Sequence, residues 1–187
     1  MSDPFFFGYG SLVNRTTHVY EDAHPAILQG WRRAWVHTAS RDMAFLSILP
    51  AQGHSIAGLI ARVPGNDWAA LDERERGYAR FDASGAVDHS AETQEIQAYA
   101  VPEHTHVNGG ENLILLSYLD VVVQGFQTEF GESGVADFFA TTDGWHTHIL
   151  NDRAAPIYPR ARTLSAQETA LVDDHLSALS AVIKERE

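Results

Sequence analysis

Strand-like patterns dominate the first hundred residues of this chain, with one short helical segment among them, and sustained helical periodicity begins only at residue 111. Turns rather than helical crossovers join the strand-like stretches, so they predict an antiparallel meander and disfavour a doubly wound fold. The fold class is therefore α+β, with an antiparallel or mixed, barrel-like sheet flanked by helices. The predicted strands after the short run at 5–7 cover residues 26–28, 31–37, 44–49, 55–63 and 93–101.

Two helical regions follow the predicted strands. Apolar residues recur at helical spacing from residue 111 through 130, and a second short helix is expected over 135–140. Ser165 and Glu168 then form a capping box, which opens a final amphipathic helix whose apolar side extends to Ile183.

The length of 187 residues and an apolar fraction of 44% are typical of one ordinary globular domain. No Pro/Gly/Ser-rich linker divides the chain, so we expect a single domain over residues 1–187 with a helical C-terminal extension from about 131. The apolar side of the last helix can pack on its own core or on a second copy, which leaves a homodimer open.

The charge balance limits the partners. Lys and Arg number 13 against 25 Asp and Glu, and the net charge of −12 repels phosphate backbones and anionic lipids. We therefore expect neither a nucleic acid nor a membrane as a partner. An acidic residue near the start, Asp3, and the early end of the apolar run at Gly8 argue against a signal peptide, so we expect a cytoplasmic protein.

Glu75 is the most informative single residue. Residues 68–76 predict a short helix that ends before Gly77, and on a helical wheel Glu75 lies on the same face as Trp68 and Leu71. A carboxyl group among apolar neighbours either acquires a raised pKa or finds a partner, and a general acid/base needs such tuning. The alternative is a structural carboxylate paired with a nearby arginine such as Arg80.

The loop after the first predicted strand, residues 8–12, is the second candidate. Gly8 and Gly10 allow close approach of a ligand to the backbone, and successive N–H groups can hold a carboxylate or an oxyanion. Ser11 lacks the flanking glycines of a nucleophile elbow, and position 13 is Val13 where a dinucleotide fingerprint needs glycine. An ordinary strand-ending turn is the alternative.

The histidines offer a competing interpretation. Two alternating pairs, His104/His106 and His146/His148, would each point to one side of an extended segment, as metal ligands do. Surface histidines are the more common explanation, so a metal-dependent hydrolase ranks low and we expect no metal. The absence of cysteine excludes thiolate ligands and cysteine nucleophiles.

Two motifs together resemble the γ-glutamylcyclotransferase superfamily: Tyr9-Gly10-Ser11-Leu12 after the first strand, and Leu71-Asp72-Glu73-Arg74-Glu75 followed by Gly77-Tyr78. Tyr118-Leu119 followed by Gly125 is similar to a third family element. The resemblance spans roughly residues 5 to 130 and implies the γ-glutamylcyclotransferase-like fold. Leu12, where mammalian γ-glutamyl dipeptide enzymes carry Asn, is more like the glutathione-degrading ChaC branch.

The resemblance also implies a reaction. Glu75 would be the catalytic acid/base, Gly8, Tyr9, Gly10, Ser11 and Leu12 would hold a small-molecule γ-glutamyl substrate, and Tyr118 would contact it. In this reaction the substrate's own α-amine attacks its side-chain carbonyl and releases 5-oxoproline, so neither a nucleophile nor a cofactor is required. A non-catalytic binding module on the same scaffold is the alternative.

The identity of the substrate stays open at this point. The substrate could be a γ-glutamyl amino acid, glutathione, a γ-glutamylamine or a γ-glutamyl group on a larger carrier. Arg15, Arg80, Arg153 and Arg160 could each bind a substrate carboxylate, and the sequence does not choose among them.

Overall fold

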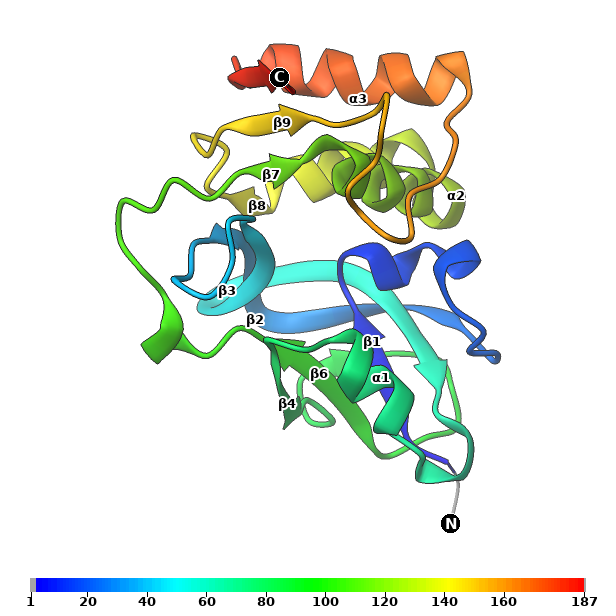
Figure 1. Ribbon diagram of the computed structural model, residues 1–187. Helices are drawn as coiled ribbons and strands as arrows, with labels where there is room; N and C mark the ends of the chain where they lie inside the picture. Colours follow the sequence, from blue (N-terminus) through cyan, green and yellow to red (C-terminus); the bar gives the residue numbers. More distant parts are fainter. Residues whose placement is uncertain (1–2, 187) are drawn as a thin grey trace.

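The computed structural model describes residues 3–186, which form a large curved sheet and a helical layer packed above it (Figure 1). The large sheet contains β1 (Phe5–Gly8), β2 (His24–Val36), β3 (Phe45–Arg62), β4 (Ala79–Asp82), β5 (Val87–Asp88), β6 (Ile96–Ala100) and β8 (Thr142–Asp143). A small sheet contains β7 (Ile114–Leu115), β9 (Ile149–Asn151) and β10 (Ile183–Glu185). The helices are α1 (Ala69–Arg74), α2 (Leu116–Ala140) and α3 (Ala166–Ala178).

The large sheet is mixed. Its strand order is β4-β6-β1-β3-β2-β5, and β8 also pairs with β2. Strand β1 pairs antiparallel with β3 and parallel with β6, and β2 pairs parallel with β8. The small sheet, in the order β10-β9-β7, is parallel. The predicted α+β class with a mixed, curved sheet flanked by helices is confirmed.

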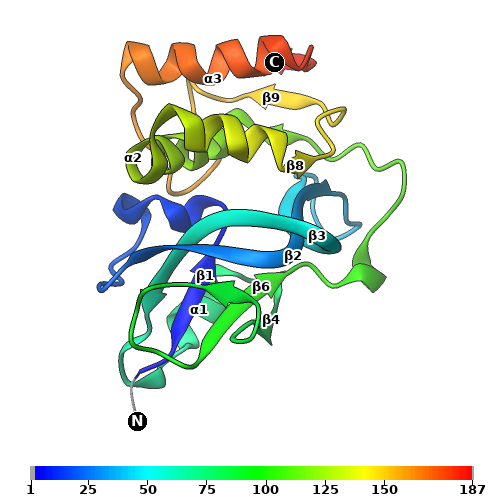
Figure 2. The same ribbon diagram turned by 180° about the vertical axis from the view of Figure 1, so that it is seen from behind.

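The four strands predicted between residues 26 and 63 are in fact two long ones. Strands β2 and β3 form an antiparallel hairpin whose register shifts between Gln29 and Trp31 (Figure 2). Gly30 and Gly53 have φ values of 82° and 80°, a backbone conformation that glycine adopts at little cost. The glycines therefore bend each strand without ending it, which lets the hairpin curl around the core.

The helix boundaries differ from the predicted ones at three places. Helix α1 ends at Arg74, so Glu75 caps it. Helix α2 begins at Leu116, not at residue 111, because the preceding Ile114–Leu115 pair with β9. Gly131, with a φ of 68°, interrupts α2 between the two helices predicted there.

Helix α3 begins as predicted and ends earlier than predicted. The capping box is present: the Glu168 N–H donates to Ser165 Oγ at 3.2 Å, and the Ser165 N–H donates to Glu168 Oε2 at 2.7 Å. The helix ends at Ala178, and residues 183–185 pair with β9 as a strand that the periodicity did not predict. The region after residue 131 thus contains strands as well as helices.

The core explains how β1 places the loop that follows it. Alternate side chains of a strand point to opposite faces, so Phe5 and Phe7 join the main core under α2. Phe6 points the other way and packs with Trp68 and Leu71 of the α1 region. Both faces of β1 are therefore buried, and residues 8–12, which follow it directly, lie between the sheet and the helical layer (Figure 1).

The C-terminal helix packs on its own chain. Val172 and Leu176 of α3 are buried in the main core. Leu179, Val182 and Ile183, at its C-terminal end and beyond, are 40 to 49% exposed. Among residues 3–186, no helix has the length and apolar character needed to cross a membrane.

Candidate active site

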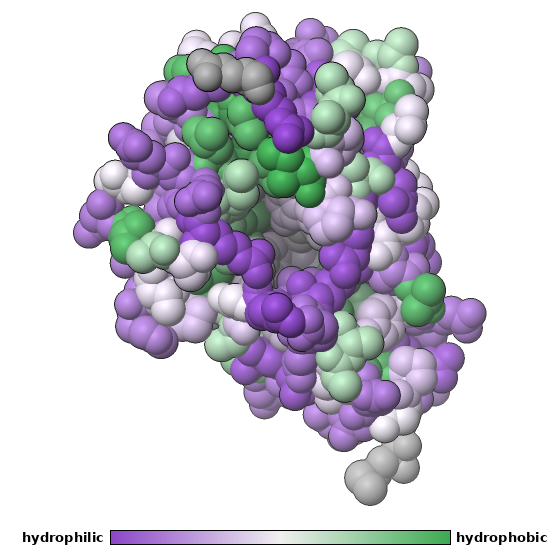
Figure 3. All heavy atoms as spheres, in the orientation of Figure 1, coloured by the Kyte–Doolittle hydropathy of each residue, from purple (hydrophilic) through white to green (hydrophobic). Residues whose placement is uncertain are grey.

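A cavity of about 320 Å³ lies where the sheet and the helical layer meet, and it appears as a hollow near the middle of the face in Figure 3. A smaller recess of about 30 Å³ adjoins it at the end of β1. The cavity and the recess share five lining residues: Ser11, Leu46, Glu75, Tyr78 and Tyr118. They therefore form one continuous site.

The recess brings together the residues proposed above as catalytic or substrate-binding, apart from the four candidate arginines. The five loop residues 8–12, Glu75 after α1, and Tyr118 in the first turn of α2 all line it. Phe7, Leu46, Tyr78 and Tyr99 complete the lining. Segments more than 100 residues apart in the sequence thus converge on a space large enough for only a few atoms.

The two loop glycines permit this close packing. A Cβ atom on Gly8 would lie 2.5 Å from Cβ of Leu12, and one on Gly10 would lie 2.6 Å from the hydroxyl oxygen of Tyr118. Cβ atoms do not make contacts this short, so a side chain at either position would force its neighbours to shift. Tyr118 consequently rests directly over the backbone of the loop.

A buried arginine fixes the loop from behind, and sequence reasoning missed it. Arg33 of β2 is fully buried, and its Nε donates to the Tyr9 carbonyl oxygen at 2.9 Å. The guanidinium also lies over the rings of Phe126 and Phe138, at 4.9 and 5.2 Å from their centroids. Burial lowers the pKa of Arg33 to about 9. Because this value is still above neutral pH, the guanidinium stays charged there. The Tyr9 hydroxyl donates to the Tyr99 carbonyl oxygen at 2.7 Å, so the loop is anchored at both ends of that residue.

Glu75 is the only acidic side chain among the described residues that line the cavity or the recess. Its side chain is 16% exposed, and burial raises the pKa of its carboxyl group. The positive charges of Arg74 and Arg160 offset part of that rise. Arg74 forms an ion pair with Glu75, with 3.1 Å between Nε and Oε1. The pKa of Glu75 is still raised, because burial is the larger effect.

Glu75 therefore does pair with a nearby arginine, as the alternative suggested, but the partner is Arg74 and not Arg80, the example given. Arg80 pairs with Asp72 instead, 3.2 Å between Nε and Oδ1, and stacks on Trp68. The Arg74 side chain is 7% exposed, and its other nitrogens donate to the Thr17 carbonyl at 2.8 Å and to Ser11 Oγ at 3.2 Å. Arg74 thus ties the end of α1 to the 8–12 loop.

The histidine pairs do not form a site. His104, His146 and His148 are exposed, and Nε2 of His106 lies 3.1 Å from the Val101 carbonyl oxygen. Within residues 3–186, no three His, Asp or Glu side chains come together in a way that could hold a metal ion. The described residues therefore include no metal centre of the kind that a metal-dependent hydrolase would need.

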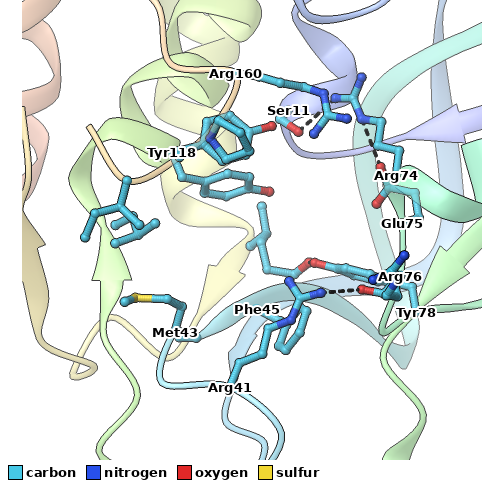
Figure 4. A pocket seen from close by; sticks show the side chains of 16 residues that line it. Ser11, Arg41, Met43, Phe45, Arg74, Glu75, Arg76, Tyr78, Tyr118 and Arg160 are labelled. Atoms are coloured by element: carbon cyan, nitrogen blue, oxygen red, sulfur yellow. Dashed lines mark hydrogen bonds and ion pairs between the residues drawn. The ribbon is translucent and has the colours of Figure 1, made fainter. Parts of the chain in front are cut away.

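Arginines and aromatic residues surround the outer cavity (Figure 4). Arg41 and Arg76 come from opposite sides, with Nη2 of Arg41 donating to the Arg76 carbonyl oxygen at 2.9 Å. Tyr78 donates its hydroxyl to the Leu46 carbonyl oxygen at 2.9 Å. The segment after β9 contributes Ile157, Tyr158, Pro159 and Arg160. Arg160 was already a candidate, and Tyr78 lies in the second motif. The sequence analysis missed the other residues around the outer cavity, because no local pattern marks them as part of a site.

Comparison with known proteins assigns the family. The family model described as "ChaC-like protein" matches residues 5–127, about two thirds of the sequence. The chain belongs to the ChaC-like family. No curated protein matches this ChaC-like chain.

Solved structures share the fold of the ChaC-like chain at low sequence identity. A structure named "Gamma-glutamyl cyclotransferase" is 13% identical with a TM-score of 0.57, and the match covers 93% of this chain and 99% of that one. The uncharacterized protein loc79017 from Homo sapiens is 13% identical with a TM-score of 0.58, over 92% and 99% of the two chains. YkqA from Bacillus subtilis is 17% identical with a TM-score of 0.57, over 77% of this chain and 57% of YkqA. These likenesses support the γ-glutamylcyclotransferase-like fold.

Proposed function

We propose that this ChaC-like protein is a γ-glutamylcyclotransferase, which releases 5-oxoproline and an amine from a small γ-glutamyl compound. The observation that carries the proposal is the largely buried Glu75 carboxyl group, which shares one recess with the 8–12 loop and Tyr118. Membership of the ChaC-like family and the fold shared with a structure named "Gamma-glutamyl cyclotransferase" support it.

The chemistry needs one group that can both accept and donate a proton. In the proposed reaction Glu75 takes a proton from the substrate's α-ammonium group, and the free amine attacks the γ-carbonyl carbon to close a five-membered ring. Glu75 then returns the proton to the leaving nitrogen as its bond to the carbonyl carbon breaks. The ring nitrogen still carries a second extra proton, which Glu75 passes in the same way to the departing amine, so that the amine leaves as an ammonium. Burial, which raises the pKa of Glu75, brings it closer to the working pH and favours both steps.

The loop supplies the other requirement, which is control of the substrate's shape. Attack is intramolecular, so folding the flexible glutamyl chain into a ring-closing geometry provides much of the acceleration. The tight packing of Gly8 against Leu12 and of Gly10 against Tyr118 gives a rigid wall for this purpose. Backbone N–H groups of the loop would stabilise the oxyanion that forms during ring closure.

The first experiment is direct detection of 5-oxoproline after incubation with γ-glutamyl dipeptides, glutathione and γ-glutamylamines, with and without EDTA. Product in the presence of EDTA supports the proposed reaction. Loss of activity on chelation would instead support a metal-dependent enzyme, and the absence of product from every compound would contradict the proposed substrate range.

Glu75→Gln tests the mechanism. An amide cannot accept the α-ammonium proton, so we expect kcat to fall by about 10²- to 10⁴-fold. A raised carboxyl pKa means that the buried charge costs stability above that pKa, so at neutral pH the variant should unfold at an equal or higher denaturant concentration. Glu73→Gln is the matched control, because that side chain, two residues earlier on α1, is 67% exposed. Full turnover by Glu75→Gln would rule out the mechanism.

The Arg74–Glu75 ion pair favours a second candidate, a binding module in which Glu75 is only a structural carboxylate. That candidate predicts unchanged ligand binding in Glu75→Gln and no 5-oxoproline from the unmodified protein. Calorimetric titration of both proteins with the same γ-glutamyl compounds therefore separates the two functions.

A further inference from the structure

Four arginines compete for the role of binding a substrate carboxylate, and three of them already have carboxylate partners. Each of the three makes an ion pair of 3.2 Å or less with an acidic side chain of the protein. None of the three lines the cavity. The pairs are Arg15 with Glu129, Arg80 with Asp72, and Arg153 with Asp120 and Asp173.

Arg160 differs from the others in both respects. It lines the cavity, and no acidic group among residues 3–186 forms an ion pair with its guanidinium. Figure 4 shows its side chain extending toward Ser11 and the Arg74–Glu75 pair. The positive charge of Arg160 lowers the pKa of the Glu75 carboxyl group, against the larger effect of burial, as expected for a guanidinium near that carboxyl group.

The electrostatics of the cavity favour an anionic ligand. Arg41, Arg74, Arg76 and Arg160 line it with Glu75 as the single acid, in a protein whose net charge is −12. Arg74 is committed to Glu75 and Arg76 to Glu73. Arg41 donates to a backbone carbonyl and lies over the Phe45 ring, at 5.0 Å from its centroid. Arg160 is thus the cation with the most donor capacity left for a ligand.

The segment that carries Arg160 is tied to the start of α2 by hydrogen bonds and by one aromatic contact. Asp152, 1% exposed, accepts hydrogen bonds from the Ser117 N–H at 2.8 Å, from Ser117 Oγ at 2.5 Å and from the Ile157 N–H at 2.8 Å. The Tyr158 ring then packs edge to face on Tyr118, with centroids 5.1 Å apart. We call residues 152–160 the strap; it lies outside the segment matched by the family model.

We propose that Arg160 binds a carboxylate of the γ-glutamyl substrate at the outer side of Glu75. This inference rests on the proposed function. The carboxylate has two sources in such a substrate: the α-carboxylate of the glutamyl group, and the carboxylate of a leaving amino acid or peptide. A planar guanidinium with free donors can bind either in a bidentate manner, which an ammonium group cannot do equally well.

The test compares substrates that differ only in the leaving-group carboxylate. We would measure 5-oxoproline release from γ-glutamyl-alanine and γ-glutamyl-ethylamine, and from glutathione and its glycine amide. The variants are Arg160→Gln, Arg160→Lys and, as the control, Arg62→Gln. The control makes the same charge change outside the cavity, where Arg62 lies near Asp3 and Asp22.

Loss of charge-assisted hydrogen bonds predicts that Arg160→Gln raises KM by about 10- to 100-fold with a smaller effect on kcat. Arg160→Lys should show a smaller rise in KM than Arg160→Gln, and Arg62→Gln should leave KM unchanged. A rise confined to the carboxylate-bearing partner of each pair identifies the leaving-group carboxylate, whereas an equal rise for both partners identifies the α-carboxylate. An unchanged KM for all four compounds overturns the inference.

Calorimetry separates failure of this inference from failure of the proposed function. If the four compounds bind but no 5-oxoproline is released, the proposed function is contradicted. The inference about Arg160 is then tested by the Kd values of the same variants in place of KM. Neither binding nor turnover of any of the four compounds by the unmodified protein would overturn the inference together with the function.

Discussion

At the scale of single residues, the site depends on the missing side chain of Gly10 as much as on the carboxyl group of Glu75. Glu75 supplies the proposed proton transfer, and its environment sets its pKa. Gly10 supplies only space, because the Tyr118 hydroxyl occupies the position that a Cβ atom would need. The shape of the recess therefore constrains Gly10 as strongly as chemistry constrains Glu75.

Gly10→Ala tests this constraint. The added methyl would lie 2.6 Å from the Tyr118 hydroxyl and 3.2 Å from Leu46, so Tyr118 or the loop must move. We expect a loss of stability of about 1–3 kcal/mol and a reduction in kcat/KM of at least about tenfold. Urea unfolding and 5-oxoproline release measure the two effects. Gly85→Ala is the control, because nothing lies within 4 Å of a Cβ there, and an unimpaired Gly10→Ala would refute the packing argument.

At the scale of elements, one buried carboxylate organises the start of α2 and the strap together. The N-cap residue of α2, Leu115, offers no side-chain acceptor, and Asp152 from a distant segment accepts the Ser117 N–H instead. A negative charge at a helix N-terminus is favourable, because it satisfies free N–H groups and complements the helix dipole. The same carboxylate holds Ile157, so the position of Tyr118 on α2 and that of Arg160 on the strap are linked.

Asp152→Asn is expected to loosen this link. The amide nitrogen would face an N–H donor, so at least one of the three hydrogen bonds is lost, at roughly 2–4 kcal/mol of stability. We expect KM to rise more than kcat falls, and faster hydrogen exchange at the Ile157 amide. Asp174→Asn, an exposed change on α3, is the matched control. Unchanged exchange and kinetics in Asp152→Asn would show that the strap is held by other contacts.

At the scale of the whole molecule, stability and the site depend on the same buried groups. His18 lies behind the loop, where its Nε2 is 3.1 Å from the Leu12 carbonyl and its Nδ1 accepts the Tyr20 N–H at 3.2 Å. Burial, with a further contribution from Arg74, lowers the pKa of His18 to about 4. An imidazole that accepts at one nitrogen and donates at the other must be neutral, so the folded state excludes the protonated form.

The pH dependence of unfolding follows from this shift. Between its ordinary pKa of 6.5 and about 4, His18 binds a proton more readily in the unfolded chain, so the free energy of unfolding falls as the pH falls through that range. The contribution is up to about 3 kcal/mol. Urea unfolding at pH 7 and pH 5 should show a smaller difference for His18→Gln than for the unmodified protein, while His54→Gln, at an exposed position, should not change the difference. Equal differences for His18→Gln and the unmodified protein would exclude this role.

Much of the fold could be predicted from local patterns. The capping box at Ser165, the face of Glu75 and the glycine loop after β1 each depend on residues close together in the sequence, where spacing determines the geometry. The strands β7, β9 and β10 could not be predicted, because pairing partners more than thirty residues apart decide whether two or three residues become a strand. The same limit explains why β2 and β3 were each predicted as two shorter strands.

The sequence by itself determined the fold class, and its resemblance to the γ-glutamylcyclotransferase superfamily suggested the seven residues proposed for the inner site and the proposed reaction. These depend on periodicity, turn residues and short motifs, all of which are local properties. Only the tertiary structure decided which arginine faces Glu75, because Arg15, Arg80, Arg153 and Arg160 are alike in sequence and differ only in their neighbours. It also revealed Arg33 and Asp152 as buried supports, since a charged side chain is buried only where distant segments provide its hydrogen bonds.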